Sequence, residues 1–216
     1  MLNWYRRWRN RKATESGRTA YNANGSRAYA TYAEYMAHQA SKLDAHNDEY
    51  LTRWLDRVGK FQRRFKPMVK DIPLEGRVLC LGARLGEEVV AFRRLGLDAI
   101  GVDLNPGENN QYVEQGDFHA LPYKDGQFKT VYSNVLDHVL DLDKFMKEAI
   151  RVCAPDGHIV LELTGGYEEL GRIDPYGALI WPTNDALMGK LWLYLQDPIY
   201  EIDLTPSHWV RAWRRN

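Results

Sequence analysis

From residue 77 onward, short apolar segments of strand length alternate with amphipathic helical segments, and this alternation constrains the fold more than any other feature. Near-continuous apolar strands separated by helices are typical of a parallel sheet that helices cover on both faces. We therefore expect an α/β fold with a doubly wound, mainly parallel sheet, whose ligands bind beyond the carboxyl ends of the strands. The expected strands lie at 77–82, 98–104, 112–117, 128–134 and 158–164, with a helix at 142–153, a second at 184–195 and a closing strand pair at 199–204 and 208–213.

Two helical patterns precede the sheet, at 27–43 and 48–66. The second carries a stripe of apolar residues at three- and four-residue spacing, which predicts a helix packed on the core. Its members are Leu51, Trp54, Leu55, Val58, Phe61 and Phe65. We divide the chain into a basic arm (1–25) with a flexible Asn/Gly/Ser break at 22–26, N-terminal helices (26–70) and a sheet domain (71–216).

The net charge of zero hides basic ends around an acidic body. Residues 1–20 carry six Lys or Arg against one acid, residues 207–216 carry three Arg, and the remaining body holds 20 basic and 28 acidic residues. A broad nucleic-acid groove needs clustered positive charge along the domain. The distribution therefore argues against nucleic acid as a partner.

Location is inferred from apolar runs and cysteines. No uninterrupted apolar run reaches the ~18 residues of a membrane-spanning helix, and the N-terminus lacks the apolar core of a secretory signal. Cys80 and Cys153 both fall in apolar segments, which suits reduced thiols, and two cysteines are too few for a metal cluster. We expect a cytoplasmic protein.

A glycine-bracketed turn follows the first expected strand in VLCLGARLGEEV (78–89). Gly82 and Gly86 allow the chain to bend sharply and a ligand to approach the backbone. Asp103 ends the second strand, 21 residues after Gly82, where a carboxylate can accept hydrogen bonds from both hydroxyls of a ribose. The combination indicates a nucleotide-like ligand, although the dinucleotide fingerprint fails at Arg84 and Glu87.

Four segments in this order resemble the class I S-adenosylmethionine (SAM)-dependent methyltransferases, particularly the group called methyltransferase type 11. They are VLCLGARLG, IGVDLNP, EQGDFHALPYKDGQFKTVYSNVLDHV and RVCAPDGHIVLEL, and they span about residues 77–164. The resemblance implies a Rossmann-like fold, SAM as cofactor and methyl transfer as the reaction. An NAD-dependent enzyme is disfavoured because its glycine fingerprint is broken.

The resemblance also implies which residues hold SAM. The methionine end would be lined by Gly82, Ala83, Arg84 and Gly86. The nucleoside end would be held by Asp103 at the ribose, Leu104 and Phe118 beside the adenine and Asp117 at the adenine amino group, with Ser133 and Asn134 closing the site.

Arg84 departs from the family pattern, which has glycine there. Its side chain either points away from the ligand, pairs with the SAM carboxylate as a guanidinium can, or impairs the site. The third outcome supports the alternative that this chain is a non-catalytic SAM-fold binding or assembly protein. We favour SAM binding because both flanking glycines and both acids, Asp103 and Asp117, are present.

Methyl transfer needs the nucleophile aligned with the methyl group, and a hydroxyl also benefits from a general base. Asp137 and His138 follow the fourth strand and are the candidate catalytic pair; the alternative is a histidine that is hydrogen-bonded for structure. Asp137, Asp141 and Asp143 could support a divalent ion, but their spacing is poor evidence and we expect no metal.

The methyl acceptor is expected to lie against the insertion 165–189, where Tyr167, Tyr176 and Trp181 could stack on a ring or belong to the core. By family analogy we expect a hydroxyl of a small molecule, such as a glycan or lipid-linked saccharide. The helix over 32–44 could close the SAM site through Tyr35, His38 and Gln39, or simply present polar positions to solvent.

Aromatic residues stand among arginines at both ends of the chain: Trp4, Tyr5 and Trp8 near the start, and Trp209 and Trp213 near the end. Such mixtures suit an anionic membrane surface, which would make the protein peripheral at a membrane, or a polyanionic ligand. The alternatives are a solvated arm or packing against a second copy in a homodimer.

Overall fold

The computed structural model describes residues 20–215, so the predicted contacts of Trp4, Tyr5 and Trp8 lie outside the described residues. Its centre is a seven-stranded sheet in the order β3-β2-β1-β4-β5-β7-β6. The pairings β3–β2, β2–β1, β1–β4 and β4–β5 are parallel, and β7 is antiparallel to both of its neighbours. The strands are β1 Arg77–Leu81, β2 Asp98–Asp103, β3 Val113–Gln115, β4 Phe128–Ser133, β5 Cys153–Thr164, β6 Tyr200–Thr205 and β7 His208–Arg214.

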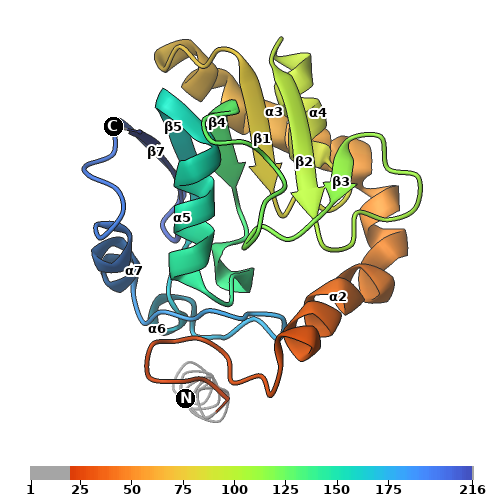
Figure 1. Ribbon diagram of the computed structural model, residues 1–216, viewed down its shortest axis with the longest axis vertical. Coiled ribbons are helices and arrows are strands. Elements are labelled where there is room, and N and C mark those ends of the chain that lie inside the picture. Colours follow the sequence, from red (N-terminus) through yellow and green to blue (C-terminus); the bar gives the residue numbers. More distant parts are fainter. Residues whose placement is uncertain (1–19, 216) are drawn as a thin grey trace, which may run out of the picture.

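Helices cover both faces of the sheet, as the apolar strands predicted. Helices α3 (Trp54–Asp71) and α4 (Glu87–Arg94) lie on one face, and α5 (Leu142–Val152) lies on the other (Figure 1). Each face has its own buried cluster. One cluster packs Phe65 and Phe92 against Tyr132, with stacked rings 4.1 Å apart between the two phenylalanines. The doubly wound α/β prediction is confirmed.

The carboxyl ends of the parallel strands meet at the lower edge of Figure 1, where the functional site lies. Helix α2 (Tyr32–Thr52), the short α6 (Tyr167–Leu170) and the segment between α6 and α7 (Asn184–Leu191) gather at this edge (Figure 1). A 3-10 turn over Leu136–His138 follows β4 there. The connections therefore bring the N-terminal helix to the ligand edge that the sheet topology predicts.

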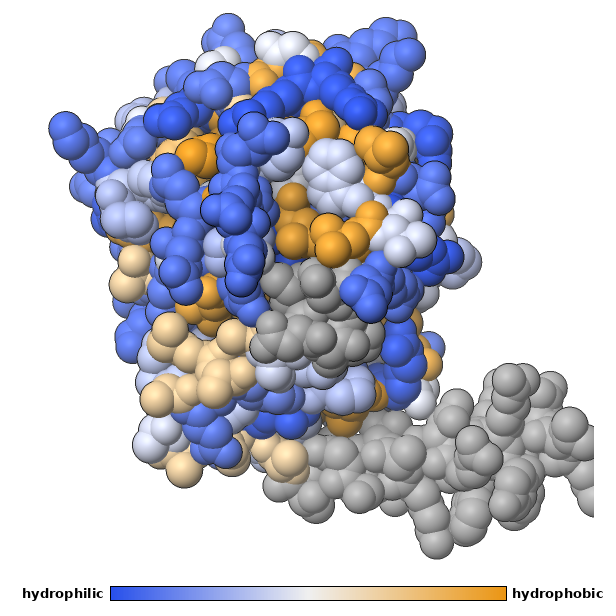
Figure 2. Space-filling view, turned by 90° about the vertical axis from the view of Figure 1, so that its right-hand side faces the viewer, coloured by the Kyte–Doolittle hydropathy of each residue, from blue (hydrophilic) through white to orange (hydrophobic). Residues whose placement is uncertain are grey.

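The apolar stripe expected to pack on the core does so over only part of its length. Val58, Phe61 and Phe65 are buried, whereas Leu51 and Leu55 are 57% and 67% exposed. The face of the molecule that carries α2, α3 and β3 is mainly hydrophilic, with hydrophobic atoms gathered near its middle (Figure 2). The start of the stripe lies before α3 reaches the sheet, which explains why its first leucines meet solvent.

The first two helices begin and end later than predicted. Helix α2 starts at Tyr32 rather than at 27, because Thr31 is its N-cap and accepts a hydrogen bond from the backbone N–H of Glu34 at 3.2 Å. It continues to Thr52, so the junction with α3 falls at Arg53 instead of near residue 44. Residues 44–47, which lie between the two predicted helices, continue α2.

The expected flexible break at 22–26 is wrong. Residues 21–27 form a tight hairpin in which Tyr21 pairs with Arg27 and Ser26 pairs with Leu179. Arg27 donates to the carbonyls of Pro175 and Gly177 at 2.8 and 2.9 Å. Asn, Gly and Ser are typical of tight turns as well as of loose linkers, and here they make a turn that packs on the sheet domain.

The C-terminal tryptophans lie in the sheet, so the membrane prediction depends on the N-terminal arm. Trp213 is 1% exposed and its indole N–H donates to the Gln196 carbonyl at 2.9 Å, and Trp209 packs at the edge of the same core. Both lie on β7, between β5 and β6. The nearby Arg211 is buried and paired with Glu201, so this basic-aromatic segment is the interior of a sheet.

Cys80 and Cys153 are both fully buried, as expected, and both are free thiols. Burial raises the pKa of the Cys80 thiol well above its ordinary value and that of Cys153 to about 11. Among residues 20–215, none of the helices has the length and apolar character needed to cross a bilayer.

Candidate functional site

The turn after β1 depends on two glycines with left-handed backbone conformations. Gly82 has φ +74°, and a Cβ there would lie 2.4 Å from Cγ2 of Val135. Gly86 has φ +82°, begins α4, and leaves no room for a Cβ beside Tyr112, which would lie 2.7 Å away. The turn therefore requires glycine at both positions for conformation and for space.

Arg84 takes the glycine-like conformation although it is not glycine. Its φ is +42°, one of three positive values at non-glycine residues in the described chain. Such a conformation costs roughly 1–2 kcal/mol for an L-residue. The backbone N–H of Arg84 donates to Oδ2 of Asp103 at 2.9 Å, and this bond helps to hold the turn. Arg84 therefore keeps a left-handed turn of the kind that glycine favours.

Asp103 links the first two strand ends. Its Oδ2 accepts from Arg84 and its Oδ1 accepts from the backbone N–H of Asn105, both at 2.9 Å. Burial raises the pKa of the Asp103 carboxyl, and these two backbone donors act in the opposite direction. Each carboxylate oxygen can accept more than one hydrogen bond, so both retain capacity for ribose hydroxyls.

Two cavities lie side by side at the strand ends. The small cavity, about 40 Å³, is lined by predicted cofactor residues and by α2: Tyr35, Gln39, Lys42, Gly82, Arg84, Asp103, Leu104, Asn105, Phe118, Val135 and His138. The large cavity, about 500 Å³, includes Ala83, Asn134, Asp137, Thr164, Tyr167, Asp174, Trp181 and His208. Lys42, Arg84, Val135 and His138 line both, so the two cavities meet at the end of β4.

Helix α2 forms the wall of the small cavity, as one of the two interpretations of 32–44 predicted. Tyr35 is fully buried and donates to the His138 carbonyl at 3.1 Å, and Gln39 donates to the Tyr176 carbonyl at 2.8 Å. His38 instead bonds Tyr29 at 2.7 Å and stacks on the Tyr176 ring. Tyr35 and Gln39 thus lie at the site, whereas His38 fastens the helix behind it.

Asp117 and Ser133 do not line either cavity. Oδ2 of Asp117 accepts from the Tyr32 hydroxyl at 2.5 Å, and Oδ1 accepts from the backbone N–H of His119 at 2.8 Å. Burial raises the pKa of the Asp117 carboxyl, but these donors outweigh burial and hold the pKa below its ordinary value. Ser133 is buried and donates to the Leu81 carbonyl at 3.2 Å, which joins β4 to β1.

His138 uses both of its ring nitrogens within the protein. Nδ1 lies 3.1 Å from the Tyr176 carbonyl, which can only accept, and Nε2 lies 2.8 Å from the Lys42 ammonium, which can only donate. The ring is therefore neutral with its proton on Nδ1. Burial lowers the pKa of Lys42, and the nearby Arg84 lowers it further. Asp137 lies 3.7 Å from the same Nε2.

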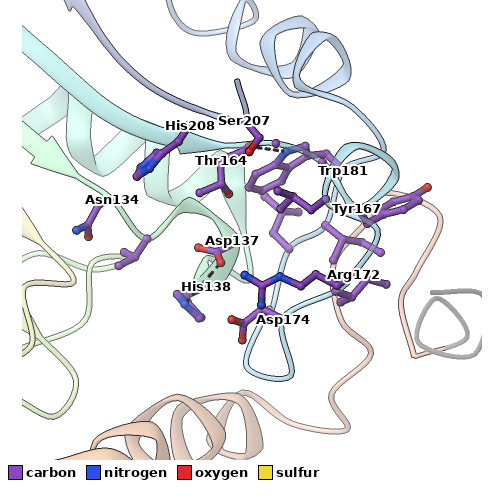
Figure 3. Close-up of a pocket in the computed structure, with 18 of the residues that line it drawn as sticks. Asn134, Asp137, His138, Thr164, Tyr167, Arg172, Asp174, Trp181, Ser207 and His208 are labelled. Carbon is purple, nitrogen blue, oxygen red and sulfur yellow. Dashed lines mark hydrogen bonds and ion pairs between the residues drawn. The ribbon is translucent and has the colours of Figure 1, made fainter. Parts of the chain in front are cut away.

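The wall of the large cavity comes from segments far apart in the sequence. In Figure 3, Asp137, Thr164 and Arg172 approach the same space from three different segments, and the start of β7 closes one side. Burial raises the pKa of the Asp174 carboxyl, but the backbone N–H of Tyr176 and nearby cations hold that pKa below its ordinary value. The charged lining suits a polar ligand.

The predicted aromatic wall is present in part. Tyr167 and Trp181 line the large cavity, and the Trp181 indole N–H donates to the Thr164 carbonyl at 3.3 Å. Both side chains are more than nine-tenths buried. Tyr176 does not line the cavity; its carbonyl positions His138 and Gln39.

Two buried acids start α4 beside the cavity. Glu87 pairs with Arg57, its Oε1 2.6 Å from Nε, and is 1% exposed. Glu88 is 3% exposed, and burial together with the Glu87 carboxylate raises its pKa well above the ordinary value. Glu88 therefore stays protonated under conditions where an ordinary carboxyl is ionised.

The three aspartates considered for a metal do not converge. Asp141 caps α5 by accepting from the backbone N–H of Lys144 at 3.1 Å, and Asp143 pairs with Lys147 at 2.7 Å. In the described part of the chain, no three His, Cys, Asp or Glu side chains are arranged to hold a metal ion.

Several residues of the site have no recognisable signal in the sequence. Lys42 lies within a helix of mixed polarity, Asp174 and Arg172 lie in an irregular segment, and His208 begins a strand near the end of the chain. They meet through tertiary packing. The insertion 165–189 was predicted to be the wall, and this signal could have suggested Asp174.

Comparison with known proteins locates a family match in the sheet domain. Residues 79–161 match the family model described as "Methyltransferase domain". Norajmaline N-methyltransferase from Rauvolfia serpentina is 34% identical over 100 residues, which cover 39% of this chain and 34% of that protein. The chain therefore aligns with about a third of this curated relative.

Two solved structures share the fold. A SAM-dependent methyltransferase of Thermotoga maritima, described as a possible histamine N-methyltransferase, matches with a TM-score of 0.63 at 17% identity, over 83% of this chain and 100% of that one. The 1,6-didemethyltoxoflavin-N1-methyltransferase of Burkholderia thailandensis, solved with bound 1,6-didemethyltoxoflavin and S-adenosylhomocysteine, matches with a TM-score of 0.64 at 17% identity, over 87% of this chain and 92% of that one.

Proposed function

We propose that this chain, which has the fold of class I SAM-dependent methyltransferases and matches the methyltransferase domain model over residues 79–161, transfers the methyl group of SAM to a small polar molecule. The nucleoside of SAM would lie at the small cavity, which must widen to admit it; the methionine end would lie where the two cavities meet, and the methyl acceptor would lie in the large cavity. Asp103 would bind the ribose, Leu104 and Phe118 would contact the adenine, and Gly82, Ala83 and Arg84 would face the methionine end.

One observation carries this proposal: the cavity lined by the predicted cofactor residues opens, at Arg84, Val135 and His138, into a second cavity of about 500 Å³. That volume lies within the range of roughly 300–1,000 Å³ found for small-molecule sites. Two adjoining cavities allow a nucleophile and a methyl donor to be held in line, which is the main requirement of methyl transfer.

The methyl acceptor is proposed to be a hydroxyl compound such as a glycan or a lipid-linked saccharide, supported by the charged and hydroxylated cavity lining. A second candidate is an amine, favoured by the similarity to norajmaline N-methyltransferase. Side-by-side assays of methyl α-glucoside, catechol and histamine with SAM separate these classes through the rate of S-adenosylhomocysteine formation.

Binding of S-adenosylhomocysteine, followed by calorimetry, tests the proposal first. We expect binding by the wild type, no binding of NAD, and a roughly 10- to 100-fold loss of affinity in Asp103→Asn, since hydrogen bonds to charged groups contribute about 1.5–3 kcal/mol. Asp98→Asn, at the exposed start of the same strand, is the matched control and should bind as wild type.

A folded wild-type protein that binds no S-adenosylhomocysteine would favour the alternative of a non-catalytic binding or assembly protein. Membrane contact through the basic arm and formation of a homodimer are separate proposals. Vesicle binding after deletion of residues 1–12 tests the first, and sedimentation tests the second.

A further inference from the structure

His208, the first residue of β7, lines the large cavity beside Ser207 and across from Thr164 (Figure 3). Its Nε2 lies 2.7 Å from Oε1 of Glu162, which is two residues before Thr164 on β5. The antiparallel register explains the meeting, because His208 pairs with Thr164 and the Glu162 side chain lies on the same face of the sheet. A histidine–carboxylate pair thus stands at the wall of the large cavity.

Glu162 is held in place by two further hydrogen-bond donors. It is 5% exposed, its Oε1 accepts from Arg64 of α3 at 2.5 Å, and its Oε2 accepts from the Tyr132 hydroxyl at 3.0 Å. A buried carboxylate paired with a guanidinium remains an acceptor. Nε2 of His208 lies 2.7 Å from Oε1 of Glu162. Nε2 must carry the proton of this contact, since two lone pairs would repel each other.

The other ring nitrogen is then the basic one. With Nε2 protonated, the neutral His208 ring has its lone pair on Nδ1. No hydrogen bond within residues 20–215 uses Nδ1 of His208, and 24% of the side chain is exposed. A carboxylate that fixes one imidazole nitrogen and leaves the lone pair of the other unused, on a residue that lines a cavity of ligand size, is the arrangement of a general base.

His138, the base predicted from the sequence, is arranged differently. Its Nδ1–H is bound to the Tyr176 carbonyl and its Nε2 lone pair is bound to the Lys42 ammonium. It has no lone pair left to take a proton unless Lys42 moves. The geometry therefore assigns His138 to the junction between the cavities and leaves His208 as the imidazole able to accept a proton.

We propose that His208 is the general base for the methyl acceptor in the large cavity and that Glu162 orients it. This role of His208 rests on the proposed methyltransferase function. The acceptor oxygen or nitrogen forms a bond to the methyl carbon as the methyl–sulfur bond breaks, and that electron pair stays on sulfur. The proton released by the acceptor moves to Nδ1 of His208, and Glu162 stabilises the resulting imidazolium. The proton then passes to water.

Several charged or titratable groups surround His208 and the large cavity, and they influence how the reaction rate depends on pH. They are Glu162 on β5, Arg64 on α3 and Tyr132 on β4, together with Glu88, Arg84 and Asp137 across the cavity. The rate should rise with pH and then level off, as is general for a reaction that needs a base.

The first experiment needs no known acceptor. Ring nitrogen shifts of the full-length protein, measured by ¹⁵N NMR at pH 8, should show His208 with its proton on Nε2 and Nδ1 bare in the wild type, and a changed tautomer balance in Glu162→Gln. A proton on Nδ1 in the wild type would overturn the proposal. His158, at the other end of β5, serves as the reference ring.

The second experiment measures methyl transfer to catechol and to histamine. His208→Gln should lower kcat by about 10²–10⁴-fold, with KM and S-adenosylhomocysteine affinity near wild type and with the rise of rate with pH lost. His208→Asn provides a second variant in case the first does not fold, and His158→Gln should leave kcat unchanged. An unchanged kcat in a folded His208 variant would refute the base role.

The outcomes separate the two proposals. A wild type that binds no S-adenosylhomocysteine refutes the proposed function, whatever the tautomer of His208. If the cofactor binds and neither probe is methylated, the NMR tautomer decides whether His208 is arranged as a base.

Discussion

The small cavity and the large cavity share four lining residues, but the protein builds them in different ways. The β1 end of the small cavity is defined by backbone: Gly82 and Arg84 have left-handed conformations, and the Asp103 carboxylate binds backbone N–H groups. The large cavity is defined by side chains that come from α2, the 165–183 segment and the β6–β7 turn. Backbone geometry tolerates few substitutions, whereas a wall of side chains can change its ligand by replacing single residues.

The largest expected effect is a loss of stability when Gly82, in the turn after β1, is replaced. Gly82→Ala should lower the free energy of unfolding by about 2–5 kcal/mol, because left-handed strain adds to overlap with Val135. Gly96→Ala is the matched control, since Gly96 also has positive φ but has no atom within 4 Å of the added Cβ. It should cost only about 1–2 kcal/mol.

Urea unfolding measures both glycine variants. Equal losses would mean that Val135 moves aside and that the small cavity is less rigid than its geometry indicates.

A second prediction concerns the wall of the large cavity and its dependence on pH. Because the pKa of Glu88 is raised in the folded protein, the unfolded chain releases this proton first as pH rises. Wild-type stability should therefore fall through the window above the ordinary carboxyl pKa, by up to about 1.4 kcal/mol per pH unit. Glu88→Gln removes this fall. The free energy of unfolding of the variant, minus that of the wild type, should therefore be larger at pH 8 than at pH 5.

Glu87→Gln is the neighbouring control, because Glu87 is paired with Arg57. It should lower stability by about 1–3 kcal/mol at both pH values. If the Glu88 variant has the same pH dependence as the wild type, Glu88 is ionised in the folded protein and the charge balance of the cavity must be revised.

The smallest expected effect lies where the two cavities meet. Arg84→Gly should change the free energy of unfolding by less than about 1 kcal/mol, since relief of strain is offset by the greater freedom of glycine in the unfolded chain. If the guanidinium pairs with the methionine carboxylate, S-adenosylhomocysteine should bind roughly 10-fold more weakly, in line with a charged hydrogen bond. Binding of 5′-methylthioadenosine, which lacks that carboxylate, should not change.

Calorimetry with the two ligands separates the three outcomes for Arg84. Tighter binding of both would show that Arg84 obstructs the site, and equal binding of both to wild type and variant would show that it points away.

The sheet was predictable because its strands are apolar and its turns contain glycine. The class I methyltransferase fold expected from the four motifs is confirmed, and the strand ends differ by only a few residues. The start of α2 depended on the Thr31 cap, which was overlooked, and the 22–26 turn could not be distinguished from a linker by composition. Trp213 and Arg211 show that a basic-aromatic segment can be an inner strand of a sheet, with a buried arginine paired to a carboxylate of the next strand.

The candidate site was predictable where the motif and the backbone coincide, as at Gly82 and Asp103. It was not predictable where side chains from distant segments converge. His208 and Glu162 meet only because β7 is antiparallel to β5, and a single sequence does not reveal that register. The roles carried over to Asp117 and Ser133 stay predictions, since both residues bond within the protein outside the two cavities.

The burial of both thiols makes the chain ready for site-specific labelling. The sequence contains two cysteines, and both are enclosed and have a raised pKa, so neither should react quickly with maleimides. A cysteine placed at Met36, which is 37% exposed on α2, would then carry a fluorophore without removal of the native thiols. Its emission would show whether α2 moves when S-adenosylhomocysteine is added.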